Sequence, residues 1–413
     1  MHETAIENVV EGSRLARAVF STDGKLLFPA GRVLNAEAIA ILRDAGVEIV
    51  NVHEIETAKE EGSGDGLPAE LQETINEIVL PRFSLLDKDN EFVNTLVQVA
   101  VQREARVLLS KAGKPVVHKP SQQKPAFHTQ KPPKVPIERM INASVKIGTL
   151  PVVFHRLVEI INNPYASVSD AAQIIATDPA LSAKLLRLVN SPFYGLANRV
   201  DTISRAVTLI GTGQLSMLAM GATLITSFKG MPVSLVNMQS FWGHSIACGV
   251  AAKLLAQQVG LGQQERFFVA GLLHDISRLL IYTQIPTHAL YLLTEAKRNN
   301  VSMHSLEEDC LGFTHEELGG ELLKLWRCPE ELIVKVQTHH EPFSPFATAE
   351  DAILPAANMI SHGLGYGSSG ELFLLSPSDN IWELLGITSD QLTTLCLNME
   401  EKVRELRSLL AAG

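Results

Sequence analysis

The second half of the chain carries an ordered series of histidines with one neighbouring carboxylate. Imidazole nitrogens and carboxylate oxygens are suitable ligands for zinc, manganese or non-haem iron. An adjacent His-Asp pair can place a nitrogen and an oxygen on one metal ion, or on two neighbouring ions, if it lies at a kinked helix end. A single histidine is more often structural, so only the whole set predicts a metal site. The set is His244, His274-Asp275, His315 and His339-His340.

The elements that must position these residues are predicted to be helices. From residue 137 to residue 413, apolar residues recur at spacings of three and four, and turn signals such as TDPA and NSPFYG separate the segments. No alternating β pattern of useful length interrupts this region. Each histidine of the set therefore lies within a predicted helix or at its end, and helix packing has to bring the set together.

The last predicted helix has a clear start signal and a single apolar stripe. Thr388 and Gln391 have the spacing of a capping box. We interpret the stripe as a core face, and a homodimer seam is the alternative. The stripe consists of Leu392, Leu395, Met399, Val403, Leu406 and Leu410.

Three stretches precede this helical region. Residues 1–56 are predicted to form a small α+β module, with a hairpin signal at Asp23-Gly24. Residues 57–110 are interpreted as a helical connector. Residues 111–136 contain six lysines, six prolines and no acidic residue, which is typical of a semi-extended linker. A basic tether for nucleic acid or an acidic partner is the alternative for that linker.

Composition limits the classes of protein that fit. The chain has 413 residues, 46% of them hydrophobic, and a net charge of −10, as expected for a globular protein of two or three domains. The acidic balance and the low aromatic content argue against a nucleic-acid or anionic-membrane binder. Four scattered cysteines indicate a reducing compartment. Because no secretory signal or membrane-spanning run is visible, we expect a cytoplasmic protein.

One long segment resembles a known family. Asp178-Pro179 has the residue types of a helix start, and Asn190-Ser191-Pro192 has those of a helix end. The string TDPALSAKLLRLVNSPFYG at 177–195, with Leu150-Pro151 and ISRAVTLIG at 203–211, resembles the HDOD domain. That family is related to the HD-type metal-dependent phosphohydrolases. The resemblance covers roughly 144–362 and implies an all-helical domain of two lobes, the second one HD-like. The module at 1–56 resembles, more weakly, a small domain found ahead of HD-GYP phosphodiesterase domains.

The histidine series resembles the ligand order of HD-GYP proteins, in which two or three metal ions activate water for phosphodiester hydrolysis. The resemblance implies one or two divalent ions (iron, manganese or zinc) and a final ligand at Asn358, where the family usually has aspartate. Ser277 and Arg278 replace the usual glycine and lysine, and the GYP motif is missing after His340. His304 and His362 fit no position in the ligand order, so we expect them to be structural or surface residues.

These departures favour a bacterial signal-transduction regulatory protein whose HDOD domain is an interaction platform for an unnamed protein partner, with a degenerate metal site. The alternative is a metal-dependent phosphohydrolase or phosphodiesterase acting on a nucleotide-type substrate. In that alternative, Asp275 and Arg278 are the catalytic candidates, with Arg278 neutralising phosphate charge. A nucleic-acid-binding regulator that uses the basic linker is a third hypothesis.

Overall fold

The computed structural model divides into two compact units, Met1–Gly66 and Leu67–Gly413, and each is described by itself. The described residues are 2–6, 9, 19–20, 26–28, 34, 36–45, 47, 49–52, 69–87, 89–110, 130–144, 150–228, 235–340, 347–375, 378 and 380–410.

The first unit combines short strands with one helix. Strand β1 (His2–Ala5) pairs antiparallel with β4 (Ile49–Val52), and β2 (Val19–Phe20) pairs antiparallel with β3 (Leu26–Phe28). Helix α1 (Ala36–Asp44) contributes to a small core with the first of these pairs. The predicted Asp23-Gly24 turn lies outside the described residues, but β2 and β3 on either side of it pair as a hairpin requires.

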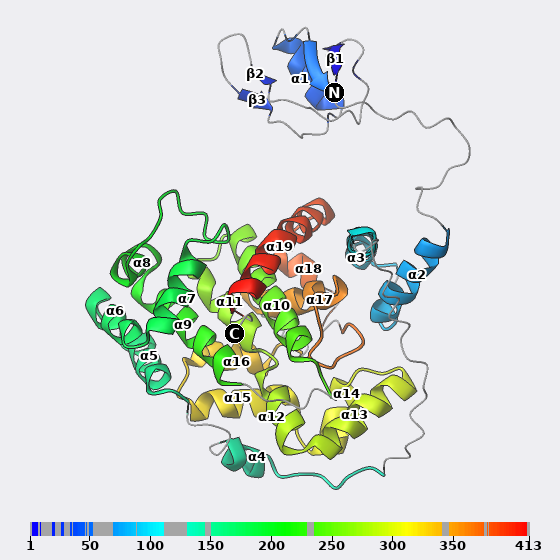
Figure 1. Ribbon diagram of the computed structural model, residues 1–413. Helices are drawn as coiled ribbons and strands as arrows, with labels where there is room; N and C mark the ends of the chain where they lie inside the picture. Colours follow the sequence, from blue (N-terminus) through cyan, green and yellow to red (C-terminus); the bar gives the residue numbers. More distant parts are fainter. Residues whose placement is uncertain are drawn as a thin grey trace. The chain divides into compact units, whose positions relative to one another are not determined.

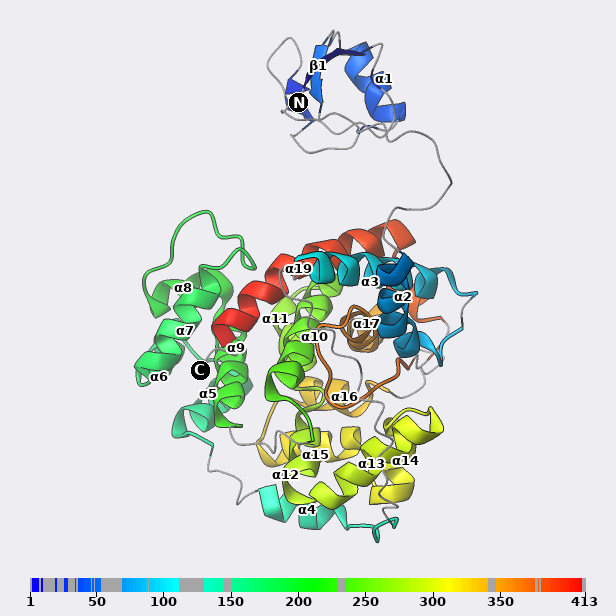
Figure 2. The same ribbon diagram turned by 45° about the vertical axis from the view of Figure 1, so that its right-hand side comes forward.

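The second unit is helical throughout its described residues, which confirms the predicted fold class. Its first lobe gathers on one side in both views (Figures 1 and 2). The helices of this lobe are α5 (Val152–Asn162), α6 (Val168–Ala176), α7 (Pro179–Val189), α8 (Ile203–Ile210) and α9 (Thr212–Ser227).

The second lobe continues along the chain to the last helix. Its helices are α10 (Met238–Gln258), α11 (Gln264–Leu273), α12 (Ile276–Gln284), α13 (Pro286–Asn299), α14 (His304–Leu311), α15 (His315–Leu325), α16 (Glu330–Gln337), α17 (Ala349–Gly363), α18 (Ile381–Leu385) and α19 (Ser389–Leu410).

Helices α10 and α11 form the centre of this unit. Their backbones lie close together because glycine residues stand where the two helices meet. A Cβ atom on Gly271 of α11 would lie 2.6 Å from the backbone nitrogen of Gly249 on α10. Neither position can therefore carry a larger side chain without moving the helices apart. Helix α10 is buried on nearly all its faces, which explains why its sequence has no polar stripe.

Of the stretch interpreted as a helical connector, residues 57–110, the part from Leu67 onward belongs to the second unit. It holds α2 (Ala69–Val79), the 3-10 helix η2 (Leu80–Phe83) and α3 (Glu91–Ser110), and α3 packs against α17 and α19. Most of the predicted linker lies outside the described residues. Its last part, residues 130–136, lies along the second lobe and leads into α4 (Ile137–Ser144), with the Val135 N–H donating to Leu311 O and Lys131 paired with Asp309.

The residues that the sequence analysis identified as helix starts make the hydrogen bonds expected of them. The Asp178 carboxylate accepts hydrogen bonds from the backbone N–H groups of Ala180 and Leu181 at the start of α7. Thr388 and Gln391 exchange the two hydrogen bonds of a capping box. The apolar stripe of α19 is buried inside the unit against α3, α7 and α10, so it is a core face.

Among the described residues, no single helix is long and apolar enough to cross a bilayer, and only α8 and α9 taken together, bent by 118°, reach that threshold.

Candidate metal centre

Helix ends position most of the histidine series. His274 follows the last residue of α11, and Asp275 follows it directly, before α12 begins, so the pair lies at a break between two helices. His315 is the first residue of α15, and the pair His339-His340 comes just after α16. His244 alone lies inside a helix, α10, from which its ring points inward. The separated sequence positions thus meet in one buried region.

One cluster of donors gathers around one oxygen of Asp275. The Nε2 atom of His274 lies 3.0 Å from Asp275 Oδ2, and the Nε2 atom of His244 lies 3.6 Å from the same oxygen. The two Nε2 atoms are 3.3 Å apart. Donor atoms bonded to one metal at about 2.1 Å lie roughly 3.0–3.4 Å apart, so two of the three separations match a ligand set and the third, between His244 and Asp275, is slightly longer at 3.6 Å.

A second cluster gathers around the other oxygen of Asp275. The Nε2 atom of His315 lies 3.1 Å from Asp275 Oδ1 and 3.3 Å from the Nε2 atom of His339. His340 joins His315 and His339 in a group whose donor atoms all lie within 4.8 Å of one another. Asp275 therefore stands between the two clusters with one oxygen toward each, as a carboxylate that bridges two ions does.

The other ring nitrogens fix the orientation of these histidines. Nδ1 of His274 lies 2.8 Å from Gly271 O, and Nδ1 of His339 lies 2.8 Å from Val336 O. Nδ1 of His315 lies 2.6 Å from Glu307 Oε2. Because a carbonyl or carboxylate oxygen can only accept, the Nδ1 atom donates in each case and the Nε2 atom faces the cluster. Metal-binding histidines are held in this way.

This arrangement fits a metal ion better than it fits hydrogen bonding alone. Two Nε2 lone pairs at 3.3 Å repel each other unless a cation or a proton lies between them. Asp275 Oδ1 is buried without a well-formed hydrogen bond. The region also buries more carboxylates than guanidinium groups. The donor set therefore supplies both the lone pairs and the negative charge that a divalent cation requires.

The pKa directions divide this donor set. Burial opposes the charged form of His274, but Asp275 outweighs it and holds the pKa of His274 well above its usual value. Burial, reinforced by neighbouring imidazoles, lowers the pKa of His339 to about 3 and keeps that of His244 well below its usual value. Burial also lowers the pKa of His315, but Glu307 and Glu316 outweigh it and raise the value to about 9. Burial opposes ionisation of Asp275, but His274 and Arg278 hold its pKa well below the usual range. A metal bound at His315 would displace a proton.

Arg278 contacts the same carboxylate. Its side chain is 1% exposed, and its Nε atom lies 3.2 Å from Asp275 Oδ1. Its Nη2 atom lies 3.4 Å from Glu307 Oε1 and 4.0 Å from Glu371 Oε2. The guanidinium is therefore surrounded by carboxylates of this chain.

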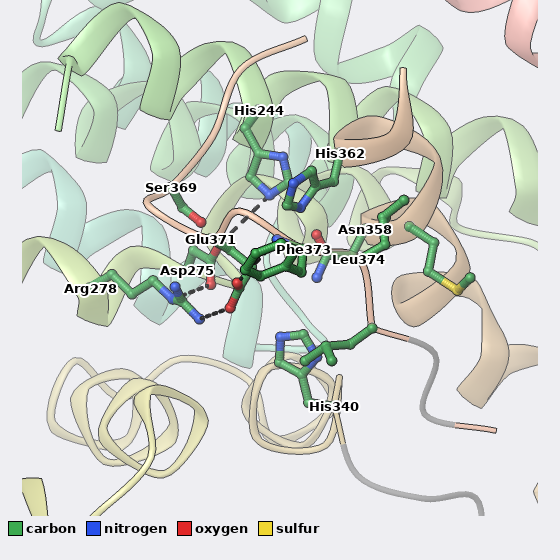
Figure 3. A pocket seen from close by; sticks show the side chains of 12 residues that line it. His244, Asp275, Arg278, His340, Asn358, His362, Ser369, Glu371, Phe373 and Leu374 are labelled. Atoms are coloured by element: carbon green, nitrogen blue, oxygen red, sulfur yellow. Dashed lines mark hydrogen bonds and ion pairs between the residues drawn. The ribbon is translucent and has the colours of Figure 1, made fainter. Parts of the chain in front are cut away.

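The cavity beside the clusters is almost closed. Its volume open to water is about 10 Å³, which is room for roughly one water molecule. Asn358 and His362, both on α17, line it with His244 and Asp275, and Figure 3 shows these side chains around one small space. The chain segment after α17, residues 369–375, covers it; we call this segment the cover.

Glu371 fastens the cover. Its carboxylate accepts hydrogen bonds from the backbone N–H groups of Met303 and His304 at the start of α14, and from those of Leu372 and Phe373 in the cover itself. The Tyr282 hydroxyl donates to Ser369 O. The closure of the cavity therefore depends on several buried hydrogen bonds.

Sequence reasoning missed several residues of this region. His362 faces the cavity, contrary to expectation, and His304 pairs with Glu316. His362 lies four residues after Asn358 on one helix, so helical spacing places both on the same face. Glu307 and Glu371 contact the site from α14 and from the cover, and no motif in the sequence marks either one.

The comparisons with known proteins agree with this fold. The fold is an all-helical domain of two lobes, and its second lobe carries the clusters of His and Asp side chains that could hold a metal ion. Residues 147–342 match the family model of the HDOD domain. The chain therefore contains an HDOD domain over these residues. No curated protein matches the sequence at a significant level.

Three solved structures share the fold. A protein from Shewanella amazonensis SB2B, provisionally described as a phosphohydrolase, is 24% identical with a TM-score of 0.53, covering 66% of this chain and 98% of its own. An HDOD domain protein of unknown function from Geobacter sulfurreducens is 21% identical, with a TM-score of 0.50 and the same coverage. A protein from Marinobacter aquaeolei VT8, provisionally described as a signal transduction protein, is 19% identical, with a TM-score of 0.52 and coverage of 75% and 66%.

Proposed function

We propose that this chain is a signal-transduction regulatory protein whose HDOD domain binds a partner protein and keeps a degenerate HD-type metal centre. The observation that carries the proposal is the small volume of the cavity. A volume of about 10 Å³ admits about one water molecule, whereas a small-molecule substrate needs several hundred Å³. That volume leaves no room for a nucleotide beside His244 and Asp275.

The surroundings of Arg278 support the same proposal. A residue that neutralises substrate phosphate must be free to meet it, but Arg278 is buried against Asp275, Glu307 and Glu371. Removing it from these carboxylates would leave uncompensated buried charge, at a cost of about 3–5 kcal/mol. Arg278 therefore suits a structural role better than substrate binding.

The metal-ligand residues suit a structural or regulatory ion. His244, His274 and Asp275 would hold one ion, and His315, His339 and His340 would hold a second with Asp275 between them. A bound ion supplies positive charge to a region rich in carboxylates, and Asn358 adds a neutral amide where an acid would add further charge. The side chains of this chain then hold the break between α11 and α12 in a fixed geometry.

The surface of the first lobe supports the binding of a partner protein. Large apolar side chains are exposed there, including Val152, which is 69% exposed, and Tyr165, which is 91% exposed. A groove of about 870 Å³ lies where the turn after α7 meets α19. We further propose a reducing compartment, the cytoplasm, which is supported by four buried free cysteines.

The test combines metal analysis with a hydrolysis screen on the full chain. We expect purified protein to carry a divalent ion at near-stoichiometric level and to hydrolyse no cyclic dinucleotide or nucleotide phosphodiester in the presence of Mn²⁺ or Fe²⁺. The exposed His155 on α5 gives a matched control, since His155→Ala should keep the metal that His274→Ala loses. Hydrolysis by the wild type that disappears in Asp275→Ala would overturn the proposal.

A second candidate function is metal-dependent phosphodiester hydrolysis. The observation that favours it is the placement of Asp275 between two donor clusters, which suits two ions that activate one water. Hydrolysis then requires the cover to open. Glu371→Ala, which removes the fastening carboxylate, should raise hydrolysis severalfold if this function is correct and should leave it undetectable if the regulatory function is correct.

A further inference from the structure

The cover is held a second time, by a segment that precedes the HDOD match. The backbone N–H of Leu374 in the cover donates to Arg82 O at 2.8 Å. Arg82 belongs to η2, far earlier in the chain. Leu374 itself lines the cavity, as Figure 3 shows. The cover is therefore fastened at two places, by Glu371 to α14 and by Leu374 to η2.

The Arg82 side chain holds the chain just before the cover. Its Nη1 atom donates to the carbonyl oxygen of Gly363, the last residue of α17, at 3.2 Å. Gly365 follows with a φ of 69°, and a Cβ atom there would collide with the Arg82 guanidinium. Glycine meets both demands, because it tolerates positive φ and leaves room for the arginine. One residue of η2 thus contacts the chain on both sides of the cavity.

Phe83 anchors η2 to the rest of the unit. It is 3% exposed and is the buried residue of this short helix. A Cβ atom on Gly363 would lie 2.9 Å from Phe83 Cζ and 3.5 Å from Leu374 Cδ1. The Phe83 ring therefore lies against the end of α17, beside the side chain of Leu374.

The structure of η2 suits it to detach. It is a 3-10 helix of four residues, a form with poorer hydrogen-bond geometry than the α-helix. No side chain caps its start, and Leu80 and Pro81 are exposed. Detaching η2 exposes one buried ring and breaks the bonds of Arg82, while α10 and α11 stay packed. Such a step is a local opening.

We propose that η2 is a latch on the cover. In place, it keeps the cavity closed, and its release frees the Leu374 end of the cover and opens the cavity on that side. Because α2 and η2 are the helices that follow the first unit along the chain, a molecule that binds and moves α2 acts on the cavity through Arg82. The latch goes beyond the proposed function and operates whether the metal centre is regulatory or catalytic.

The test is hydrogen–deuterium exchange on the full metal-free chain, read by mass spectrometry. Phe83→Ala removes the anchor, so the amides of residues 372–374 should exchange about tenfold faster or more. Arg82→Gln loses only the side-chain bond and should raise the same exchange severalfold. The matched controls are Phe154→Ala, which removes a buried ring from α5, and Arg106→Gln, which removes an exposed arginine from α3. Both should leave the exchange of the cover at the wild-type rate.

Modification of His362 by diethyl pyrocarbonate gives a second measurement. His362 lines the cavity and is 7% exposed, so it should react slowly in the wild type and severalfold faster in Phe83→Ala. Circular dichroism identifies a variant that does not fold, in which case Arg82→Gln provides both measurements. Wild-type rates in the folded latch variants, or an equal rise in Phe154→Ala, would overturn the proposal. Neither measurement reads bound metal or hydrolysis, so the outcome is distinct from that of the proposed function.

Discussion

The clearest prediction concerns Glu307, which orients a metal ligand without belonging to either inner cluster. Its Oε2 atom accepts hydrogen bonds from both the backbone N–H and the Nδ1–H of His315, at 2.8 and 2.6 Å. Its Oε1 atom lies 3.4 Å from Arg278 Nη2. Glu307→Gln keeps the shape of the side chain but removes its charge, and it places an N–H₂ group against either His315 or Arg278.

The expected loss follows from these contacts. Removing the partner of a ligating histidine typically weakens metal binding 10–100-fold. We expect the upper end, about 100-fold or roughly 2.7 kcal/mol, because Glu307 is fully buried and water cannot replace it. The loss of charge beside Arg278 should also lower the free energy of unfolding by about 1–3 kcal/mol.

The assay is competition for Zn²⁺ against a chromophoric chelator, at a temperature where circular dichroism shows each variant folded. The exposed neighbour Glu308 provides the matched control, since Glu308→Gln changes the same charge one residue away. A Kd for Glu307→Gln within about twofold of the Glu308→Gln value would refute the reasoning, because it would mean that the orientation of His315 does not depend on Glu307.

Three other perturbations test the packing and the centre. Chelation of bound metal should lower the Tm, since an ion present at 100 times its Kd contributes about 2.7 kcal/mol; an unchanged Tm in calorimetry would contradict a bound ion. Lys253→Met leaves the Glu265 carboxylate buried without the ammonium group that lies 2.9 Å from it, and should lower the free energy of unfolding in urea by about 3–5 kcal/mol. The double variant Lys253→Met, Glu265→Leu should recover most of that loss, and no recovery would contradict this explanation. Gly271→Ala should separate α10 from α11, costing about 1–3 kcal/mol and weakening zinc binding; retained stability and affinity would show that the helices can adjust.

Local features of the second unit were predictable because their causes lie within a few residues. The caps at Asp178 and Thr388 depend on side chains bonding to backbone N–H groups two or three positions away. The sequence analysis names a kinked helix end as the condition for His274-Asp275 to act as a ligand pair, and the break between α11 and α12 meets that condition. The order of the histidine series then indicated which ligands would meet, although it could not give their distances.

Other features depend on long-range packing and left no local signal. His304 was expected to be structural or exposed, and it meets Glu316 only because α14 and α15 start side by side. Arg278 could be read as a phosphate ligand until Glu371, far along the chain, proved to lie beside it. The small volume of the cavity depends on the fold of the cover, which no periodicity or motif describes.

The way Glu371 is bonded has a consequence for how fast an ion could exchange. Its carboxylate holds four backbone N–H groups, two of them at the start of α14, so lifting the cover frees the end of a helix as well as a loop. Such an opening is a local unfolding event and therefore rare. An ion enclosed during folding would stay with the molecule for long periods, and the metal content of a purified sample would reflect the conditions under which the chain was synthesised.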